Sequence, residues 1–509
     1  MSDSQKETPP GPDLTVGVPA SSIVDGSILL GHVNNEPVLL ARTSGSVYAI
    51  GATCTHYGGP LAEGILVDDT VRCPWHHACF SLKTGEALRA PALDRVSCFR
   101  VEEIDGTVFV RESIEPPSVY LRPLASPPTS VVIVGAGAAG VAAAEMLRRC
   151  GYAGTIKLFD QSHTAPVDRP NLSKDYLAGH AEEEWVNLRP EDFYTAHNIE
   201  LLRGERIAQI DTRTRNVVTE TGEIVKFSVL LLATGSSPVK LPVPGADLPT
   251  VHYLRTLTDS NAIIAAAKQG KRAVVIGASF IGLEVAAALR ERDVAVTVVA
   301  PESLPLERVL GADLGRMIQA LHESKGVTFN LGAGVKSITP GSVELASGTS
   351  LPADFVVVGV GVRPNVTLAQ EAGLHVDNGV VVDSSLATSA PGIYAAGDIA
   401  SWPDPRAGQI RVEHWVVAER QGQTAARNML GANEPFTLTP FFWSRHFDLT
   451  VNYVGHSARD DKPRVDGSPI AHDCTVTYVA ATGATSAQAD VGRDRMNLLA
   501  EARFDGELS

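Results

Sequence analysis

The chain has 509 residues, enough for about three or four domains, and a formal net charge of −15 at pH 7. This acidic balance, without a Lys/Arg run, argues against nucleic acid or an anionic membrane surface as a partner. No apolar run approaches the roughly 20 residues of a membrane span. The polar start, residues 1–13, has the pattern of neither a signal peptide nor a mitochondrial presequence, so we expect a cytoplasmic protein.

The pattern of strands, helices and turns predicts several domains. An all-β domain of short strands is followed by strand–helix alternation, which indicates two α/β dinucleotide-binding domains, and then by a small C-terminal α+β domain. The expected boundaries are a disordered lead (1–13), the all-β domain (14–113), a proline-rich linker (114–129), the first dinucleotide-binding domain (130–250), the second (251–375), a return to the first (376–436) and the C-terminal domain (437–509).

The all-β domain contains two pairs of metal-binding residues. Cys54-x-His56 is followed by Cys73-x-x-His76, and each pair stands on a loop with Gly or Pro. A Rieske [2Fe–2S] cluster needs two thiolates for one iron and two imidazoles for the other. Zinc is the competing metal, but zinc fingers usually separate the cysteines from the histidines, and here each half is mixed. We therefore predict Cys54, His56, Cys73 and His76 as ligands of a Rieske cluster.

Neighbouring positions differ from those of respiratory Rieske proteins. Gly59 and Trp75 stand where those proteins carry a disulfide, and Ala78 stands where they carry a serine that donates to the cluster. Fewer hydrogen bonds to sulfur stabilise the reduced cluster less, so we expect a potential nearer about −150 mV than +300 mV. His77 and Cys79 are interpreted as neighbours that pack beside the ligands.

A glycine-rich turn opens the first dinucleotide-binding domain. The strand before it leads into G-x-G-x-x-G and a helix, a pattern that brings the backbone close to a pyrophosphate. A turn without a ligand is the alternative, but Asp160, twenty residues after the last glycine, ends the next strand where an acid binds a ribose diol. The predicted phosphate turn consists of Gly135, Ala136, Gly137, Ala138, Ala139 and Gly140.

A second turn of the same kind lies in the second dinucleotide-binding domain. Serine replaces its middle glycine and is still small enough to admit a pyrophosphate. Glu302, two positions beyond the next strand, would repel a 2′-phosphate, which favours NADH over NADPH. The residues predicted to bind the nicotinamide dinucleotide are Gly277, Ser279, Ile281, Gly282 and Glu302.

These motifs carry a family resemblance. Together with Asp168–Lys174, Ala233-Thr234-Gly235, Gly359–Asn365 and Gly397-Asp398, they make residues 130–435 similar to the ferredoxin-reductase branch of the two-dinucleotide-binding flavoproteins. With the Rieske motif in front, the chain resembles the Rieske-containing apoptosis-inducing-factor-like proteins over roughly residues 15–460. The resemblance implies FAD in the first dinucleotide-binding domain and NAD(P)H in the second.

The resemblance also implies roles for individual residues. Lys174 and Glu284 would form a pair beside the flavin, with Glu284 reaching the nicotinamide amide, and Trp415 would lie near the isoalloxazine. The other residues expected at FAD are Arg169, Ile207, Thr234, Gly235, Gly361 and Asp398.

The predicted function is an NAD(P)H-dependent FAD oxidoreductase that passes electrons to its own Rieske cluster and on to an acceptor such as an oxygenase or another redox protein. Residues 161–200 contain no cysteine, which argues against delivery to a dithiol. No Asp with two closely spaced histidines follows to hold a mononuclear iron. A redox-sensing or signalling protein with slow NADH oxidation, and a flavin enzyme acting on a quinone or radical, remain as alternatives.

Overall fold

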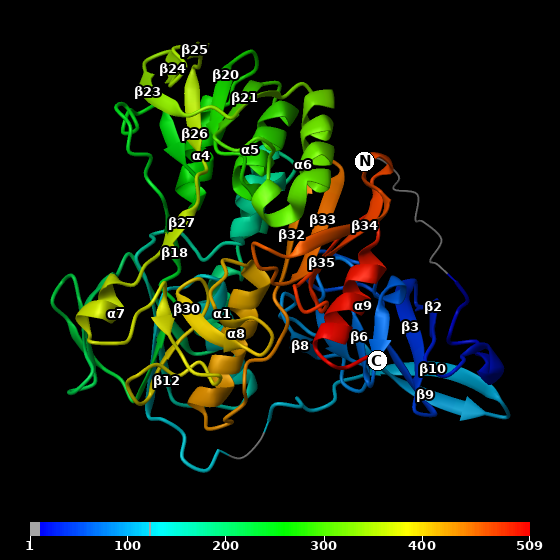
Figure 1. Ribbon diagram of the computed structural model, residues 1–509. Coiled ribbons are helices and arrows are strands. Elements are labelled where there is room, and N and C mark those ends of the chain that lie inside the picture. Colours follow the sequence, from blue (N-terminus) through cyan, green and yellow to red (C-terminus); the bar gives the residue numbers. More distant parts are fainter. Residues whose placement is uncertain (1–10, 122–123, 509) are drawn as a thin grey trace, which may run out of the picture. The chain divides into compact units, whose positions relative to one another are not determined.

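The computed structural model describes residues 11–121 and 124–508, so most of the predicted lead lies outside the described residues. The chain divides into two compact units (Figure 1). The first unit comprises Met1–Ala125, Arg149–Tyr152 and Asp494–Ser509, and the second comprises Ser126–Arg148 and Ala153–Arg493.

Two antiparallel sheets form the first unit. Asn34-Asn35 and Asp105-Gly106 adopt positive φ, as tight hairpin turns require, and each joins two neighbouring strands. The six-stranded sheet has the order β1-β10-β9-β4-β3-β2, and the four-stranded sheet has the order β5-β6-β7-β8. The strands are β1 (Val18–Pro19), β2 (Ile28–Val33), β3 (Glu36–Thr43), β4 (Ser46–Gly51), β5 (Ile65–Val67), β6 (Thr70–Arg72), β7 (Cys79–Ser81), β8 (Ala87–Arg89), β9 (Cys98–Ile104) and β10 (Thr107–Ile114).

The C-terminal helix α9 (Asp494–Phe504) belongs to this first unit. Its buried residues Leu498 and Ala502 pack against Ile65 and Val67 of β5. The predicted C-terminal domain, 437–509, is therefore divided between the two units: residues 494–509 belong to the first and the rest to the second. The helix's apolar residues find their partners more than 400 positions earlier in the chain, which no local pattern could reveal.

Part of the predicted linker is held by the first unit. The hydroxyl of Ser118 and the backbone N–H of Val119 donate to the carboxylate of Glu86 at 2.7 and 2.9 Å, and the Tyr120 hydroxyl donates to the carbonyl of Leu88 at 2.9 Å. Glu86 is 4% exposed, and a buried carboxylate needs such donors. The segment before residue 121 is thus fixed by these bonds to the first unit.

Two parallel five-stranded sheets organise the second unit (Figure 1). Their central strands are mostly buried runs rich in Val, Ile and Leu, as expected for sheets covered on both faces. The first, ordered β13-β12-β11-β17-β29, contains β11 (Ser130–Val134), β12 (Thr155–Asp160), β13 (Ile199–Arg203), β17 (Val229–Leu232) and β29 (Ile393–Ala395). The second, ordered β19-β26-β20-β21-β22, contains β19 (Val251–Tyr253), β20 (Arg272–Ile276), β21 (Ala295–Ala300), β22 (Thr328–Leu331) and β26 (Phe355–Val358).

Helices α1 (Ala138–Arg149) and α5 (Phe280–Glu291) follow β11 and β20 through the two glycine-rich turns. After the second sheet the chain returns, and β29 pairs in parallel with β17 of the first. The first sheet is therefore built from segments that stand on both sides of the second sheet in the sequence.

A third, antiparallel sheet ends the second unit, ordered β32-β33-β36-β35-β34. Its buried side chains share a core with α5 and with α6 (Glu307–Ser324). The strands are β32 (Phe441–His446), β33 (Leu449–Gly455), β34 (Lys462–Ser468), β35 (Asp473–Val479) and β36 (Thr485–Val491).

The second unit also contains other helices and strands. They are η3 (Arg169–Ser173), α2 (Asp175–Ala178), η4 (Glu183–Val186), α3 (Glu191–Ala196), β14 (Ile207–Asp211), β15 (Asn216–Thr219), β16 (Ile224–Lys226), β18 (Ser236–Pro238), α4 (Leu257–Ala266), β23 (Val335–Thr339), β24 (Ser342–Leu345), β25 (Ser350–Pro352), β27 (Val362–Pro364), α7 (Thr367–Glu371), β28 (Val380–Val381), β30 (Ala400–Asp404), β31 (Gly408–Ile410) and α8 (Trp415–Met429).

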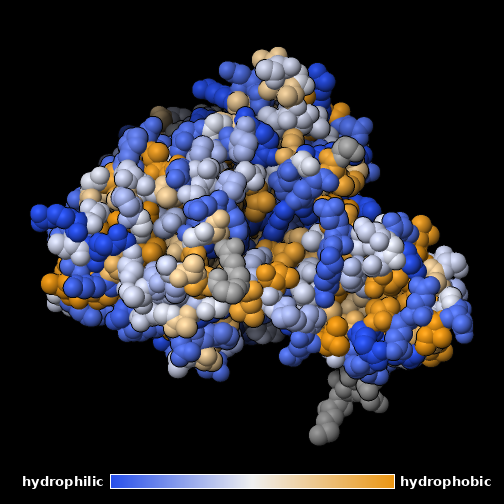
Figure 2. All heavy atoms as spheres, turned by 90° about the horizontal axis from the view of Figure 1, so that it is seen from below, coloured by the Kyte–Doolittle hydropathy of each residue, from blue (hydrophilic) through white to orange (hydrophobic). Residues whose placement is uncertain are grey.

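The surface mixes residue types. Hydrophilic and hydrophobic residues alternate in small areas over the face in Figure 2, which is usual for a globular protein. In the ranges that the structure describes, no helix is long and apolar enough to cross a membrane.

The packing of α9 makes a first prediction. Leu498 is fully buried against β5, so Leu498→Ala should destabilise the first unit by about 2–5 kcal/mol. Hydrogen–deuterium exchange should become faster in β5 and β6 and stay unchanged in the parallel sheets. Met496→Ala on the same helix is the control, because Met496 is 43% exposed. Equal exchange in both variants would show that α9 is not part of this core.

Candidate functional site

The two predicted ligand loops of the first unit come together. Each is closed by a backbone bond of 2.8 Å, from Cys54 N–H to the Gly59 carbonyl and from Cys73 N–H to the Ala78 carbonyl. The Nδ1 atoms of His56 and His76 are 3.2 Å apart. A hydrogen bond between the two thiols lowers the pKa of Cys54 and raises that of Cys73, which places the sulfurs next to each other. Burial lowers the pKa of His56 to about 3, so its imidazole is neutral, the form that binds metals.

The surroundings of the sulfurs fit a cluster. Backbone N–H groups of His56 and Tyr57 bond to the Cys54 sulfur, and these bonds favour the thiolate. A Cβ on Gly59 would lie 2.7 Å from the Cys73 sulfur, so this position tolerates only glycine. Within 11–121 and 124–508, no three or more Cys, His, Asp or Glu residues are placed to hold a single metal ion. A Rieske cluster does not require this, since each of its irons takes two protein ligands.

Two neighbours of the ligands differ in exposure. Trp75 beside His76 is 40% exposed, whereas His77 is fully buried. The Nδ1 of His77 lies 3.1 Å from a carboxylate oxygen of Glu501 on α9, and Arg72 lies 3.6 Å from the same oxygen. His77 and Cys79 are both buried, in agreement with the expected packing role.

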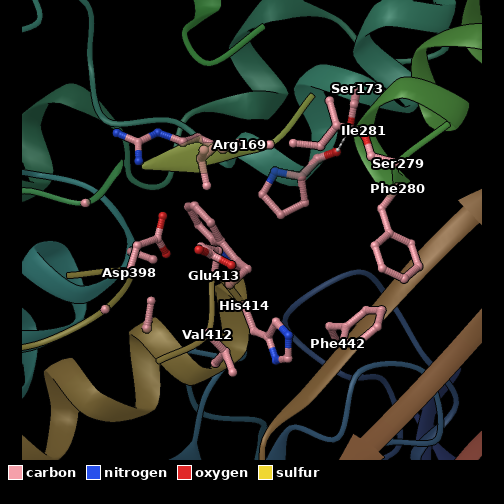
Figure 3. A pocket seen from close by; sticks show the side chains of 18 of the residues that line it. Arg169, Ser173, Ser279, Phe280, Ile281, Asp398, Val412, Glu413, His414 and Phe442 are labelled. Atoms are coloured by element: carbon pink, nitrogen blue, oxygen red, sulfur yellow. Dashed lines mark hydrogen bonds between the residues drawn. The ribbon is translucent and has the colours of Figure 1, made fainter. Parts of the chain in front are cut away.

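The second unit contains a cavity of about 670 Å³ (Figure 3). Both glycine-rich turns contribute to its wall. The predicted residues that line it are Gly137, Ala138, Ala139, Arg169, Lys174, Gly235, Ser279, Ile281, Glu284, Gly361, Asp398 and Trp415. The predicted residues outside its lining are Gly135, Ala136, Gly140, Asp160, Ile207, Thr234, Gly277, Gly282 and Glu302.

The glycines of the first turn serve different purposes. A Cβ on Gly135 or Gly140 would meet backbone carbonyl oxygens at 2.3 or 1.9 Å, so these two glycines let the strand, turn and helix pack together. A Cβ on Gly137 would come no closer than 3.3 Å, to the flexible side chain of Arg169, and would point toward the cavity wall. The missing side chain of Gly137 therefore leaves open space at the cavity wall.

The second turn repeats this geometry. A Cβ on Gly277 would lie 2.3 Å from the Gly359 carbonyl oxygen, and one on Gly282 would lie 2.2 Å from the Gly277 carbonyl oxygen. Ser279 caps helix α5: its hydroxyl donates to the Gly359 carbonyl at 2.7 Å and accepts from the Gly282 N–H at 3.3 Å. The serine thus fits the turn without filling it.

Opposite charges meet at one end of the cavity, where Figure 3 shows Arg169 and Asp398. Burial raises the pKa of Asp398, but Arg255 at 2.9 Å, the Ser236 hydroxyl at 2.5 Å and Arg169 outweigh burial and hold this pKa below its usual value. Burial lowers the pKa of Arg169 to about 10, and it still carries its charge at neutral pH. The carboxylate and guanidinium are both ionised and available to a polar ligand.

The predicted pair, Lys174 and Glu284, is formed. The Lys174 ammonium lies 2.8 Å from Oε2 of Glu284, which is 4% exposed. The Ser173 hydroxyl donates to the same oxygen at 2.5 Å, and the Ser444 hydroxyl donates to Oε1 at 2.7 Å. The buried carboxylate is thus bonded by one cation and two hydroxyls.

Aromatic rings lie at the other end of the cavity (Figure 3). The ring centroid of Phe442 is 4.9 Å from that of Phe280 and 4.7 Å from that of His414.

Several residues that line the cavity were not predicted from the sequence. Phe280 lies within the second turn and could have been noticed there, but no local signal marks Arg255, Phe442 and Trp443.

Two family models match different parts of the chain. Residues 129–422 match the family described as pyridine nucleotide-disulphide oxidoreductase, and residues 15–100 match the Rieske [2Fe–2S] domain. The chain therefore belongs to the pyridine nucleotide-disulphide oxidoreductase family, with a Rieske domain in front.

Individual relatives agree with this assignment. Human apoptosis-inducing factor 3 is 35% identical over 452 residues, which cover 84% of this chain and 74% of that protein. Rhodocoxin reductase of Rhodococcus erythropolis is 39% identical over 345 residues, covering 67% of this chain and 81% of that one. A solved structure of the covalent putidaredoxin reductase–putidaredoxin complex matches with a TM-score of 0.73 and 34% identity, over 75% of this chain and 94% of that chain.

These matches confirm the resemblance derived from the motifs. The chain is an FAD-dependent NAD(P)H oxidoreductase of the ferredoxin-reductase type, in which electrons pass from NAD(P)H through FAD to a Rieske cluster.

The two kinds of glycine in the first turn make a second prediction. Gly140→Ala should lower the yield and thermal stability of the second unit, because its Cβ meets backbone. Gly137→Ala should fold with near-normal stability but lose FAD, because its Cβ occupies space at the cavity wall. Bound FAD per protein, measured beside the melting temperature, separates these outcomes. Full FAD occupancy in Gly137→Ala would contradict the assignment of this turn.

Proposed function

We propose that the cavity of the second unit holds FAD along the first glycine-rich turn and brings the nicotinamide ring to it from the second turn. One observation carries this proposal: Gly137, Ser279 and the Lys174–Glu284 pair all line the same cavity. A dinucleotide bound by each turn would extend toward the same space, where hydride transfer requires the two rings to meet.

The first sheet supplies the groups for FAD. Gly137 and the α1 N-terminus would accept its pyrophosphate, and Asp160, at the end of β12, would bind the ribose diol. Asp398 and Arg169 would bind polar groups of the cofactor at the charged end of the cavity. Trp415, at the start of α8, would cover the flavin ring. Ile207, Thr234, Gly235 and Gly361 complete the proposed FAD set.

Lys174 and Glu284 would control the approach of the nicotinamide. While paired, the two side chains occupy part of the cavity wall with opposite charges. Opening the pair would leave the ammonium near electron-rich flavin and free Oε2 of Glu284 to accept a hydrogen bond from the carboxamide. Both residues therefore contribute binding and orientation to the reaction.

The Rieske cluster would be held by Cys54 and Cys73 on one iron and by His56 and His76 on the other. The adjacent thiols, the neutral imidazole of His56 and the contact of Gly59 with the Cys73 sulfur support this assignment. The exposed Trp75 beside the histidines gives the cluster an edge that another redox group can approach.

The final acceptor would be a redox protein or an oxygenase component, by analogy with relatives. One relative from Burkholderia cepacia is the ferredoxin–NAD(+) reductase component of an anthranilate 1,2-dioxygenase system, and the solved relative is linked to putidaredoxin. A signalling role is the second candidate, favoured by the 35% identity to apoptosis-inducing factor 3. Slow NADH oxidation with every one-electron acceptor would favour the signalling role.

We propose that the protein is located in the cytoplasm. Cell fractionation tests this location.

A third prediction tests the electron path. Anaerobic NADH should bleach the flavin absorbance of the wild type and produce the EPR signal of a reduced Rieske cluster. Cys73→Ala removes a proposed cluster ligand, so its flavin should still be reduced by NADH but no Rieske signal should appear. A wild-type cluster that stays oxidised while the flavin is fully reduced would refute transfer between the two groups.

A fourth prediction concerns the nucleotide. Glu302 lies 3.2 Å from Arg308, whose side chain is 81% exposed. We expect a higher kcat/KM for NADH than for NADPH, because Glu302 binds a ribose diol and repels a 2′-phosphate. Glu302→Ala should lower the ratio of kcat/KM for NADH to kcat/KM for NADPH, because it removes the carboxylate and releases Arg308 from its ion pair. Glu323→Ala, at the far end of α6, should leave this ratio unchanged. A wild-type preference for NADPH would contradict the assignment.

A further inference from the structure

A buried hydrogen-bonded chain leads away from Glu284. The Ser444 hydroxyl donates to Oε1 of Glu284 at 2.7 Å, and Nε2 of His446 lies 3.2 Å from the Ser444 oxygen. Nδ1 of His446 lies 3.2 Å from Nε2 of His322 on α6. Ser444, His446 and His322 are fully buried, and they are absent from the cavity lining. This series of hydrogen bonds therefore supports Glu284 from outside the cavity.

The hydrogen bonds of this chain all point toward Glu284. A carboxylate only accepts, so Ser444 donates its proton to Glu284 and must accept from Nε2–H of His446. Burial lowers the pKa of His446 to about 3 and that of His322 to about 2, so both imidazoles are neutral. Nδ1 of His446 is then an acceptor and receives Nε2–H of His322. Nδ1 of His322 has no hydrogen-bond partner among the residues that the structure describes, and the chain ends there.

The two oxygens of Glu284 have different partners. Oε2 is bonded by Lys174 and Ser173, and Lys174 lines the cavity. Oε1 is bonded by Ser444, which belongs to strand β32 of the third sheet. Ser444 and His446 are two residues apart on this strand, so both point to the same face. Loss of the Lys174 contact at Oε2 would leave the bond at Oε1 intact.

We propose that Ser444, ordered by His446 and His322, is a positioning residue that keeps the Glu284 carboxylate in place when Lys174 leaves it for the nicotinamide. The inference rests on the proposed contact between Glu284 and the nicotinamide carboxamide. It gives the third sheet a part in nucleotide binding. Without the hydrogen bonds from Ser444, His446 and His322, the Glu284 carboxylate would lose much of its stabilisation once Lys174 had left it. It would then turn toward other donors in the buried site.

Binding of NAD+ to the oxidised holoenzyme, measured by titration calorimetry, tests this without turnover. Ser444→Ala should raise the Kd by about tenfold or more, because a hydrogen bond to a charged group is lost. Ser444→Thr keeps the hydroxyl and should bind nearly as the wild type does. Ser486→Ala is the matched control: Ser486 lies on β36 of the same sheet and donates to a different carboxylate, Asp461. Wild-type affinity in Ser444→Ala would overturn the proposal.

Glu284→Ala separates this inference from the function on which it rests. If Glu284→Ala binds NAD+ as tightly as the wild type, the proposed role of Glu284 is wrong. If Glu284→Ala weakens binding and Ser444→Ala does not, only the positioning role of Ser444 fails.

A measurement on the wild-type protein remains decisive if Ser444→Ala does not fold. NMR of 15N-histidine-labelled holoenzyme, with resonances assigned through His446→Gln and His322→Gln, reports the proton on each ring nitrogen. His446 and His322 should both be neutral and protonated at Nε2 near pH 7. An imidazolium, or a proton on Nδ1 of His446, would break the inferred direction of the chain and overturn the proposal.

Discussion

The buried carboxylate of Glu284 is the constraint on which the second unit's site depends. Removing a carboxylate from water costs several kcal/mol unless donors replace the water. Here the donors come from Lys174 and Ser173 around η3 and from Ser444 on β32, while Glu284 itself stands on α5. These bonds join η3, helix α5 and strand β32 of the third sheet. The same carboxylate lines the cavity to which both glycine-rich turns contribute, so the bonds that stabilise it also hold part of the wall of the proposed cofactor site.

The two halves of the electron path place different demands on the chain. In the proposed site of FAD and nicotinamide the structure supplies open space, through the missing side chain at Gly137 and the small Ser279, and charges at Arg169 and Asp398. Around the proposed Rieske ligands it supplies close contact: Gly59 lies against the Cys73 sulfur, and backbone N–H groups bond to Cys54. Joining both units in one chain keeps the cluster at a high effective concentration near its electron donor, which a separate ferredoxin would have to achieve by diffusion.

Short motifs predicted many of the residues that the structure brings to the cavity. The glycine turns, Asp160 and the Cys/His loops are short-range patterns, since their geometry is set by a few consecutive residues. Contacts between distant segments could not be read in this way. Leu498 of α9 packs on β5, and Ser444 and His446 reach Glu284 from β32, yet none of these residues stands in a recognisable motif. Phe442 could not be predicted either, because a tertiary contact between distant segments brings its ring to Phe280.

The central claim is that electrons from NADH reach the Rieske cluster of the same chain. Stopped-flow reduction by excess NADH, followed at the cluster's absorbance over a tenfold range of protein concentration, tests this claim directly. Transfer within one chain predicts a first-order rate constant for cluster reduction that does not change with dilution. A rate constant that falls in proportion to protein concentration would show that the electrons travel between separate molecules, and it would contradict the account.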